Sequence, residues 1–390
     1  MDDDIAAFVE LAGRRRWAAR MAELRRTAGA HSGRARQQRH ALELSLDRLR
    51  RGGAPEGAAE RRLRDLAADT AAIASALPAS GLARLRDRLA AALDGDATLV
   101  PLFHLVRTAA LQRERGFAVD FAGLADAAPF DLLLRRDGIE AEVACEVVSA
   151  EDGRELHRGA WVRLMDRVDP DLQTWLAAHP GRYLLKLTLP QGLRSEAGDG
   201  AVLPALHARI RAMLAAQRRA DYDEAAVLRL DPLMLAGAQA DELGLMSSLR
   251  REFGHEAHLA VTAAGGGVFV MAARAGRENE VAVAIRRRMA AVAPARLTGT
   301  RPGILAMFVE DTDRAEWRHL RERLELEGEA RQFLTHPEAR PVVAVTCTSR
   351  FELLGAAAPD AAPEGELRFR NPAHPAARMA ALAPSVLSSP

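Results

Sequence analysis

The stretch FDLLLRRDGIEAEVACEVVS, from Phe130 to Ser149, decides the fold class of this chain. Its two ends, Phe130–Arg135 and Ala141–Ser149, are apolar or alternating runs with the character of β-strands. Between them stands the dipeptide Asp137-Gly138, which favours a tight two-residue turn. The sequence therefore predicts a β-hairpin at this point.

Helical and strand-like periods alternate on both sides of the hairpin. A helix and a strand are expected before it, at Pro101–Arg115 and Phe117–Phe121. After it we expect, in order, a helix at Glu155–Ala178, a strand at Tyr183–Leu189, a helix at Leu203–Arg219 and a strand at Ala226–Leu230. This alternation predicts an α/β fold in which helices cover both faces of a mixed sheet.

Composition along the chain suggests four segments. Residues 1–97 have leucines at helical spacing, which predicts a helical arm, either an antiparallel hairpin or a short coiled coil. Residues 98–235 form the α/β core, and residues 236–354 form a C-terminal α/β module that contains a second hairpin. Residues 355–390 are rich in Ala, Pro and Gly, so a flexible tail is expected there.

No apolar run approaches the roughly 20 residues that a bilayer-spanning helix needs. The first residues, Met1 to Asp4, lack the basic and then apolar pattern of a secretory signal. We therefore expect a cytoplasmic protein without a membrane partner. Cys145 and Cys347 each lie in an apolar run, which suits buried reduced thiols better than a disulfide or a zinc site.

The formal net charge is +1, so attraction to nucleic acid must come from local clusters. Between Arg14 and Arg51 there are 12 arginines and three carboxylates. This cluster has two possible interpretations. It is either a basic surface that binds nucleic acid, or an ordinary solvated face of the helices in a chain whose high arginine content reflects codon bias. The same helices are candidates for self-association or for binding a protein partner.

The helix, strand and hairpin around Asp131 and Glu146 resemble the PD-(D/E)XK nuclease superfamily, over about Pro101 to Leu230. The resemblance implies a mixed sheet of restriction-endonuclease-like type. It also implies an acid at the start of the second strand, an acid-x-lysine triplet on the third, and a Mg²⁺ ion held between them. Asp131 occupies the position of the first acid.

The triplet departs from the family pattern. Strand geometry sends Val143, Cys145 and Val147 to one face, and Glu142, Ala144, Glu146 and Val148 to the other. Ala144-Cys145-Glu146 then occupies the triplet, with alanine in place of the acid and glutamate in place of the lysine. The metal ligands that the resemblance still implies are Asp131, Glu146 and the carbonyl of Cys145, because Mg²⁺ needs only one or two carboxylates.

Two residues are candidates to replace the missing groups. Glu142 lies on the same face as Ala144 and could supply the acid, while Lys186, the only lysine, could supply the ammonium from the next predicted strand. Under this hypothesis Asp131, Glu142, Glu146 and Lys186 are the catalytic residues. The alternative is that Lys186 is simply the solvent-facing residue of its strand.

The run after the third strand, Ser149 to Arg158, resembles one in bacterial relatives of these nucleases, where a glutamate-cysteine-lysine triplet precedes it. The resemblance implies that Arg154, His157 and Arg158 bind nucleic-acid phosphates. The alternative is an ordinary helix start capped by Asp152. A second acidic run, Glu310–Asp313, is expected to cap the helix that follows it rather than to bind metal.

These observations lead to two functional hypotheses. The first is a metal-dependent phosphodiester hydrolase acting on DNA or RNA, or a degenerate descendant of one. The second is a non-catalytic binding or scaffold protein that uses the same fold. They differ in whether Asp131 and Glu146 meet in one metal-binding cluster with Glu142 or Lys186.

Overall fold

The computed structural model describes residues 3–28, 33–194, 201–233, 242–254 and 256–388. The chain forms two compact units, each built from separate segments. The first unit comprises Met1–Arg25, Arg39–Asp152 and Ala282–Pro390, and the second comprises Arg26–Gln38 and Gly153–Val281. Most of the second unit is therefore an insertion into the first.

The first unit is built on a mixed six-stranded sheet. Its strands are β1 (Ala118–Asp120), β2 (Leu132–Arg136), β3 (Ile139–Ser149), β9 (Gly303–Glu310), β10 (Val342–Ser349) and β11 (Leu367–Arg370), in the order β1-β2-β3-β9-β10-β11. The three middle strands β3, β9 and β10 run parallel, and the outer pairs are antiparallel. The predicted α/β class with a mixed sheet is confirmed.

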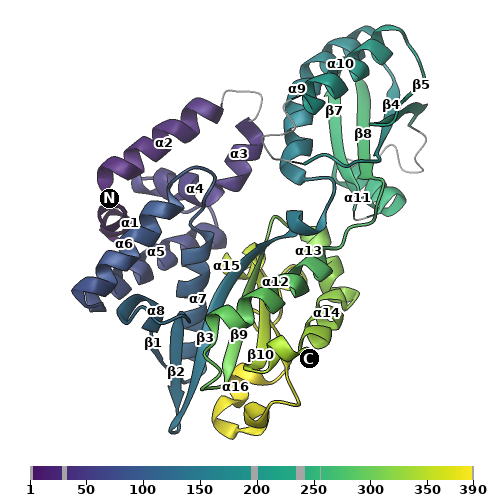
Figure 1. Ribbon diagram of the computed structural model, residues 1–390. Coiled ribbons are helices and arrows are strands. Elements are labelled where there is room, and N and C mark those ends of the chain that lie inside the picture. Colours follow the sequence, from purple (N-terminus) through teal and green to yellow (C-terminus); the bar gives the residue numbers. More distant parts are fainter. Residues whose placement is uncertain (1–2, 29–32, 195–200, 234–241, 255, 389–390) are drawn as a thin grey trace. The chain divides into compact units, whose positions relative to one another are not determined.

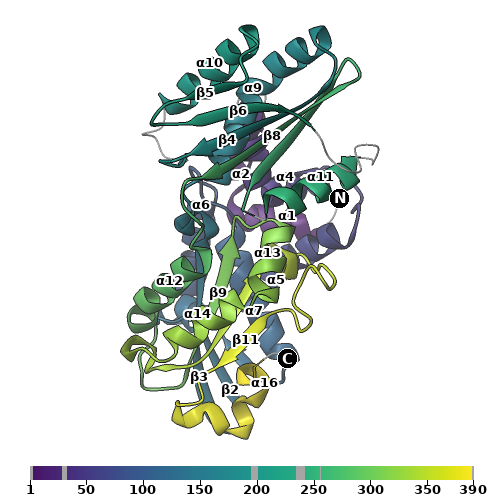
Figure 2. The ribbon, with the colours of Figure 1, turned by 90° about the vertical axis from the view of Figure 1, so that its right-hand side faces the viewer.

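Helices cover both faces of this sheet. α7 (Val100–Glu114) packs against β1, β3 and β9, whereas α12 (Val281–Arg296), α13 (Arg314–Glu322) and α14 (Glu325–Phe333) lie on the opposite face (Figures 1 and 2). The chain passes from β3 to β9 and then to β10, and each new strand is added on the same side of the previous one. Because both crossover connections are expected to be right-handed, the helices within them lie on the same face of the sheet.

The N-terminal region is helical, as predicted, but it is part of the main core. Its helices are α1 (Asp3–Ala12), α2 (Arg14–Ala28), α4 (Ala41–Arg50), α5 (Ala58–Ala76) and α6 (Ala79–Ala92). Buried side chains from them, such as Phe8, Trp17 and Leu66, share one hydrophobic cluster with Val143 and Phe308 of the sheet. These helices therefore form a bundle on the sheet rather than a separate arm.

The hairpin of β2 and β3 has the predicted turn. Asp137 and Gly138 have φ values of 50° and 75°, the left-handed conformation that this turn requires. The predicted alternation also holds, because Val143, Cys145 and Val147 pack against the main core while Glu146 bonds to side chains of α12. Residue 146 therefore faces α12 and not α7.

The second unit contains its own five-stranded sheet, in the order β5-β6-β4-β8-β7. The strands are β4 (Arg182–Leu189), β5 (Ala220–Tyr222), β6 (Val227–Pro232), β7 (His258–Ala264) and β8 (Gly267–Ala275). The helices are α3 (Gly33–Arg39), α9 (Arg158–Ala178), α10 (Val202–Ala215) and α11 (Glu242–Phe253). β4 pairs with β8 and β6, and not with the β2–β3 hairpin.

This division differs from the expected one of 98–235 and 236–354. The strand expected to continue the core, β4, belongs to the second unit, and the strand beside β3 is β9, more than 150 residues further along the chain. Local patterns predict that a segment is a strand, but they do not specify its partner. The expected boundary therefore fell inside the inserted unit.

The segment expected to be a flexible tail is ordered over residues 355–388. β11 pairs with β10, and Leu382 and Val386 are fully buried in the main core. The remaining short elements are α8 (Ala122–Ala125), α15 (Arg350–Leu353), α16 (Ala383–Val386) and the 3₁₀ turns Ala150–Gly153, Pro337–Ala339, Pro375–Arg378 and Ala380–Leu382. The small residues of this segment pack against the sheet instead of remaining in solvent.

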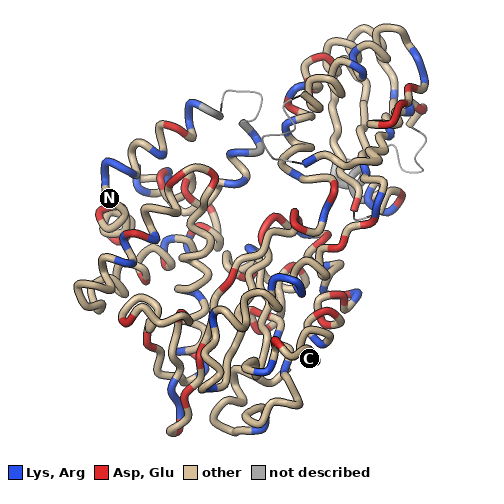
Figure 3. The backbone as a smooth tube through the Cα atoms, viewed as in Figure 1, with Lys and Arg blue, Asp and Glu red and all other residues tan. Residues whose placement is uncertain are grey.

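Basic and acidic residues are interleaved along the backbone (Figure 3). In the N-terminal bundle Asp47 accepts bonds from Arg25, Arg50 and Arg51, so one carboxylate compensates part of the charge of these three arginines and the segment stays basic. Among the described residues, no helix combines the length and the apolar character that crossing a membrane would require.

Candidate functional site

Asp131 stands immediately before β2 and is fixed by its backbone. Its N–H donates to the carbonyl of Val143 (2.9 Å), and its carbonyl accepts from the N–H of Gly123 (3.0 Å). A Cβ at Gly123 would lie 2.8 Å from the carbonyl oxygen of Phe130 and 3.1 Å from the Cα of Asp131. Only glycine allows α8 to approach this closely, and the approach holds Asp131 opposite β3.

The Asp131 side chain is 3% exposed and carries four hydrogen bonds. Both terminal nitrogens of Arg88, on α6, donate to Oδ1 at 3.1 Å. Oδ2 accepts from Arg296 at 2.7 Å and from the backbone N–H of Cys145 at 2.9 Å. Two arginines therefore compensate a carboxylate that burial alone would make costly to ionise.

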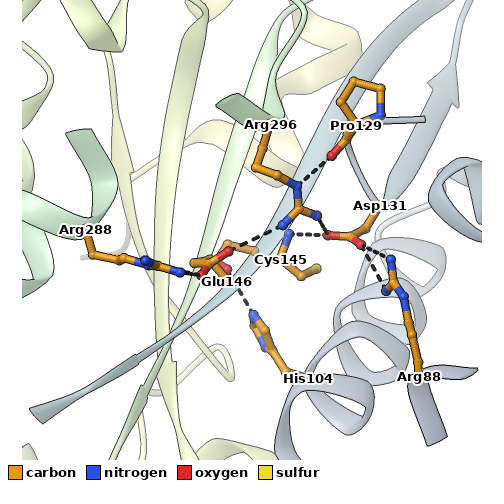
Figure 4. Close-up of polar contacts among 9 residues, drawn as sticks. Arg88, His104, Pro129, Asp131, Cys145, Glu146, Arg288 and Arg296 are labelled. Atoms are coloured by element: carbon orange, nitrogen blue, oxygen red, sulfur yellow. Dashed lines mark hydrogen bonds and ion pairs between the residues drawn. The ribbon is translucent and has the colours of Figure 1, made fainter. Parts of the chain in front are cut away.

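Glu146 lies on β3, and its carboxylate points toward α12. Its Oε1 accepts from Arg288 Nε (3.0 Å) and from a terminal nitrogen of the same guanidinium. Its Oε2 accepts from Arg296 at 3.4 Å. Figure 4 shows Arg296 between the two acids, with one nitrogen directed at Asp131 and another at Glu146.

The third nitrogen of Arg296, Nε, donates to the carbonyl of Pro129 at 2.6 Å. One guanidinium is thus surrounded by three oxygen atoms, from Pro129, Asp131 and Glu146, each on or beside the β2–β3 hairpin. We call Asp131, Glu146, Arg88, Arg288 and Arg296 the arginine-carboxylate cluster.

This cluster does not fit a bound Mg²⁺ ion as it stands. Ala144, at the triplet's acid position, offers no side-chain oxygen, and the acids that remain are bonded to arginines. Within the described part of the chain, no group of three or more His, Cys, Asp or Glu side chains could hold a metal ion. A cation is nevertheless present between the acids, and it is a guanidinium.

Glu142 does not join the cluster. Its side chain is fully buried, and its two oxygens accept from the backbone N–H of Thr298 (2.9 Å) and from the Thr298 hydroxyl. Arg301 lies 3.6 Å from the same carboxylate. Glu142 therefore holds the loop that enters β9, and it has no oxygen directed at Ala144.

Lys186 lies on β4 of the second unit, in a different sheet from Asp131. Its ammonium is 3.4 Å from Asp231 and 5.7 Å from the ring centre of Phe253. Arg154, His157 and Arg158 also belong to the second unit, where Arg154 is buried and His157 precedes α9. The sequence places these four residues after the hairpin, but none belongs to the unit that carries it.

Two titratable groups beneath the cluster are neutral near pH 7. Burial lowers the pKa of His104 to about 4, and its Nε2 donates to the carbonyl of Ala306 at 3.0 Å. Desolvation, and then the charge of Asp131, raises the pKa of the Cys145 thiol well above its usual value. Neither is suited to act as a base or nucleophile at neutral pH. Both cysteines are free thiols, as expected.

The second acidic run lies at the end of β9. Asp313 caps α13 by accepting from the N–H of Glu316 at 2.9 Å, so the predicted cap is confirmed. Glu310 accepts from the Thr98 hydroxyl at 3.4 Å. Burial, together with the nearby charge of Asp311, raises the pKa of Glu310 to about 7.

The three arginines of the cluster, Arg88, Arg288 and Arg296, were not predicted from the sequence. Arg88 lies in the region predicted to be a helical arm, and Arg288 and Arg296 lie on α12, in the segment expected to form a separate C-terminal module. The chain has 54 basic residues, almost all of them arginine, and no local pattern distinguishes these three. Their role depends on tertiary contacts between distant segments.

Comparison with known proteins gives no relative: no protein-family model, curated protein or solved structure matches this chain.

Proposed function

We propose that this chain is a nuclease-fold protein of restriction-endonuclease-like type that binds without cutting. It is a degenerate descendant of metal-dependent phosphodiester hydrolases and has become a binding or scaffold module. The observation that carries the proposal is the guanidinium of Arg296, bonded to both Asp131 and Glu146 at the position where the family resemblance implies a metal ion.

The order of elements supports the nuclease-like part of the proposal. In the first unit the chain runs through α7, the antiparallel strands β1, β2 and β3, then α12, and then β9, which is parallel to β3. This is the succession of a helix, three strands, a helix and a strand that the sequence predicts for the region of the resemblance, with α12 and β9 in place of the expected helix Glu155–Ala178 and strand Tyr183–Leu189. The second unit interrupts it between β3 and α12.

The chemistry of the cluster supports the non-catalytic part. Hydrolysis of a phosphodiester requires groups that activate water and stabilise charge on the phosphate, usually a metal ion with open positions. Here Ala144 supplies no ligand, Glu146 stands at the lysine position, and Glu142 is bonded to Thr298. The four acid oxygens of Asp131 and Glu146 all accept from arginines.

Nucleic acid is the ligand class that we expect for this module. Arg88 and Arg288 have side chains that are 41% and 49% exposed, so each can donate to a phosphate while it keeps its carboxylate partner. A protein partner at the N-terminal helices is the competing expectation.

The second candidate is an active Mg²⁺-dependent nuclease. One observation favours it: Asp131 and Glu146 are close enough to share one guanidinium, so an arriving ion could displace Arg296 and bind both.

The test is cleavage of labelled single- and double-stranded DNA and RNA with Mg²⁺ or Mn²⁺, with anisotropy measured on the same substrates. We expect binding without cleavage above the level of an Asp131→Ala preparation. Metal-dependent cleavage that is lost in both Asp131→Ala and Glu146→Ala would overturn the proposal in favour of the active nuclease.

A further inference from the structure

Arg296 occupies the central position in the arginine-carboxylate cluster. It is the last residue of α12, its side chain is 29% exposed, and each nitrogen of its guanidinium has an oxygen partner. Within the cluster, Arg88 forms an ion pair with Asp131 and Arg288 forms one with Glu146, whereas Arg296 forms ion pairs with both acids. It also stands at the centre of the three oxygen atoms of Pro129, Asp131 and Glu146.

The charges around Arg296 show what its removal would do. Asp131 would keep Arg88 and the N–H of Cys145, but its Oδ2 would lose the charged donor that it has in the structure. Glu146 would keep Arg288 on Oε1, but Oε2 would lose the partner it has in the structure. Two carboxylate oxygens and one carbonyl oxygen would then face one unfilled position.

Those three atoms are hard oxygen donors, the type that Mg²⁺, Mn²⁺ and Ca²⁺ prefer, and water can complete the coordination sphere. A guanidinium is larger than any of these ions, so the donors must move inward to bind one. Asp131 is fixed by the Gly123 and Val143 contacts, but the longer Glu146 side chain, 13% exposed, can adjust.

We propose that Arg296 is a built-in counter-ion that closes a latent divalent-cation position, so that removing its guanidinium lets a metal ion bind between Asp131 and Glu146. This inference rests on the proposed loss of the metal centre. In the native chain the arginine holds β2, β3 and α12 together without metal, and the cation position is closed to ions from solvent.

The experiment compares Mn²⁺ binding to the full-length native chain, Arg296→Ala and Arg296→Met, with the melting temperature as the readout. Methionine keeps an apolar stem of similar reach without the guanidinium, which guards against a folding failure of the alanine variant. We expect Mn²⁺ to raise the melting temperature of both variants, with an affinity at least tenfold above that of the native chain.

Three controls locate the ion. Arg287→Ala removes an exposed arginine from the same helix and should leave Mn²⁺ binding at the native level. Arg296→Lys keeps a cation in place and should also bind no additional Mn²⁺. Adding Asp131→Asn to Arg296→Met should abolish the increase in Mn²⁺ affinity.

The outcomes separate this inference from the proposed function. Folded Arg296 variants that do not respond to Mn²⁺, or a gain that survives Asp131→Asn, would overturn the counter-ion role while leaving the non-catalytic function intact. A native chain that binds Mn²⁺ as tightly as Arg296→Met would overturn the inference, and cleavage by that native chain would overturn the proposed function separately.

Discussion

Two neighbouring parts of the first unit bury carboxylates, and each deals with the charge differently. At Asp131 three residues supply four hydrogen bonds, and two of those residues are arginines. At Glu310 the carboxylate accepts from the Thr98 hydroxyl, and the pKa rises to about 7. One acid is neutralised by a guanidinium, and the other is partly neutralised by a proton.

The difference follows from which cations are within reach. α6 and α12 each direct an arginine at Asp131. Glu310 instead has Asp311 beside it, and the charges of Asp311 and of the buried Glu43 both raise its pKa. Ionisation of Glu310 is therefore opposed by burial and by like charge, and these effects on its pKa outweigh those of Arg39 and the Thr98 hydroxyl, which favour the ionised form. The comparison predicts a large loss of stability when Asp131 is removed and a pH-dependent contribution to stability from Glu310.

The largest expected effect is at the arginine-compensated site. Asp131→Ala would leave Arg88 and Arg296 without their shared acid, and we expect the free energy of unfolding to fall by about 3 kcal/mol. Urea unfolding at pH 7 measures this. Asp120→Ala is the control, because Asp120 is 52% exposed in its pair with Arg135 and should cost less than about 1 kcal/mol. Equal losses in the two variants would show that Asp131 is not specially stabilised.

The next effect concerns Glu310 and pH. Its folded-state pKa is raised above the unfolded value, so folding takes up a proton and stability falls as pH rises from about 4.5 to about 7. This group contributes a loss of up to about 3 kcal/mol over that range. Glu310→Gln should remove that part of the slope, whereas Glu322→Gln, at an exposed position on α13, should keep it. Identical pH profiles for the native chain and Glu310→Gln would contradict this account.

The helix cap at the end of the same strand gives a smaller effect. Asp313→Ala removes the acceptor for the Glu316 N–H and should cost about 1 kcal/mol, whereas Asp313→Asn should cost less because it keeps an acceptor oxygen. Thermal unfolding of both variants measures the difference. A loss in Asp313→Asn as large as that in Asp313→Ala would mean that charge, rather than the cap, matters here.

The smallest effect sharpens the comparison within the cluster itself. Arg288 is 49% exposed and serves only Glu146, so Arg288→Ala should change the free energy of unfolding by no more than about 1 kcal/mol. Arg296→Ala should cost more in the same urea titration, since it removes bonds to two acids and a carbonyl. The reverse order would show that the bridging position of Arg296 carries no extra stability.

The sequence predicted what depends on local pattern. Asp137-Gly138 specified the hairpin, the alternation in β3 placed Glu146 on the face opposite Val143, and Asp313 was recognised as a cap. Each of these features depends on residues only a few positions apart. Their physical causes, namely turn conformation, strand pleating and helix capping, act over that same distance.

What the sequence could not predict depends on distant segments. β3 pairs with β9, and almost the whole second unit lies between these two strands in the chain. Lys186 belongs to that second unit and therefore lies in another sheet. The sequence showed alanine and glutamate at positions 144 and 146, but it did not show the arginine between Asp131 and Glu146, because Arg296 reaches Asp131 only through the tertiary fold. Side chains that close a site from remote helices have no signature in a single sequence.

The most direct test of the central claim is electron paramagnetic resonance of Mn²⁺ titrated into the native chain, because bound Mn²⁺ loses the sharp signal of the free ion. With the acids occupied by arginines, we predict that the signal remains that of free Mn²⁺ at equimolar protein. A one-to-one loss of signal that Asp131→Asn and Glu146→Gln both abolish would contradict the claim that a guanidinium has taken the place of the metal.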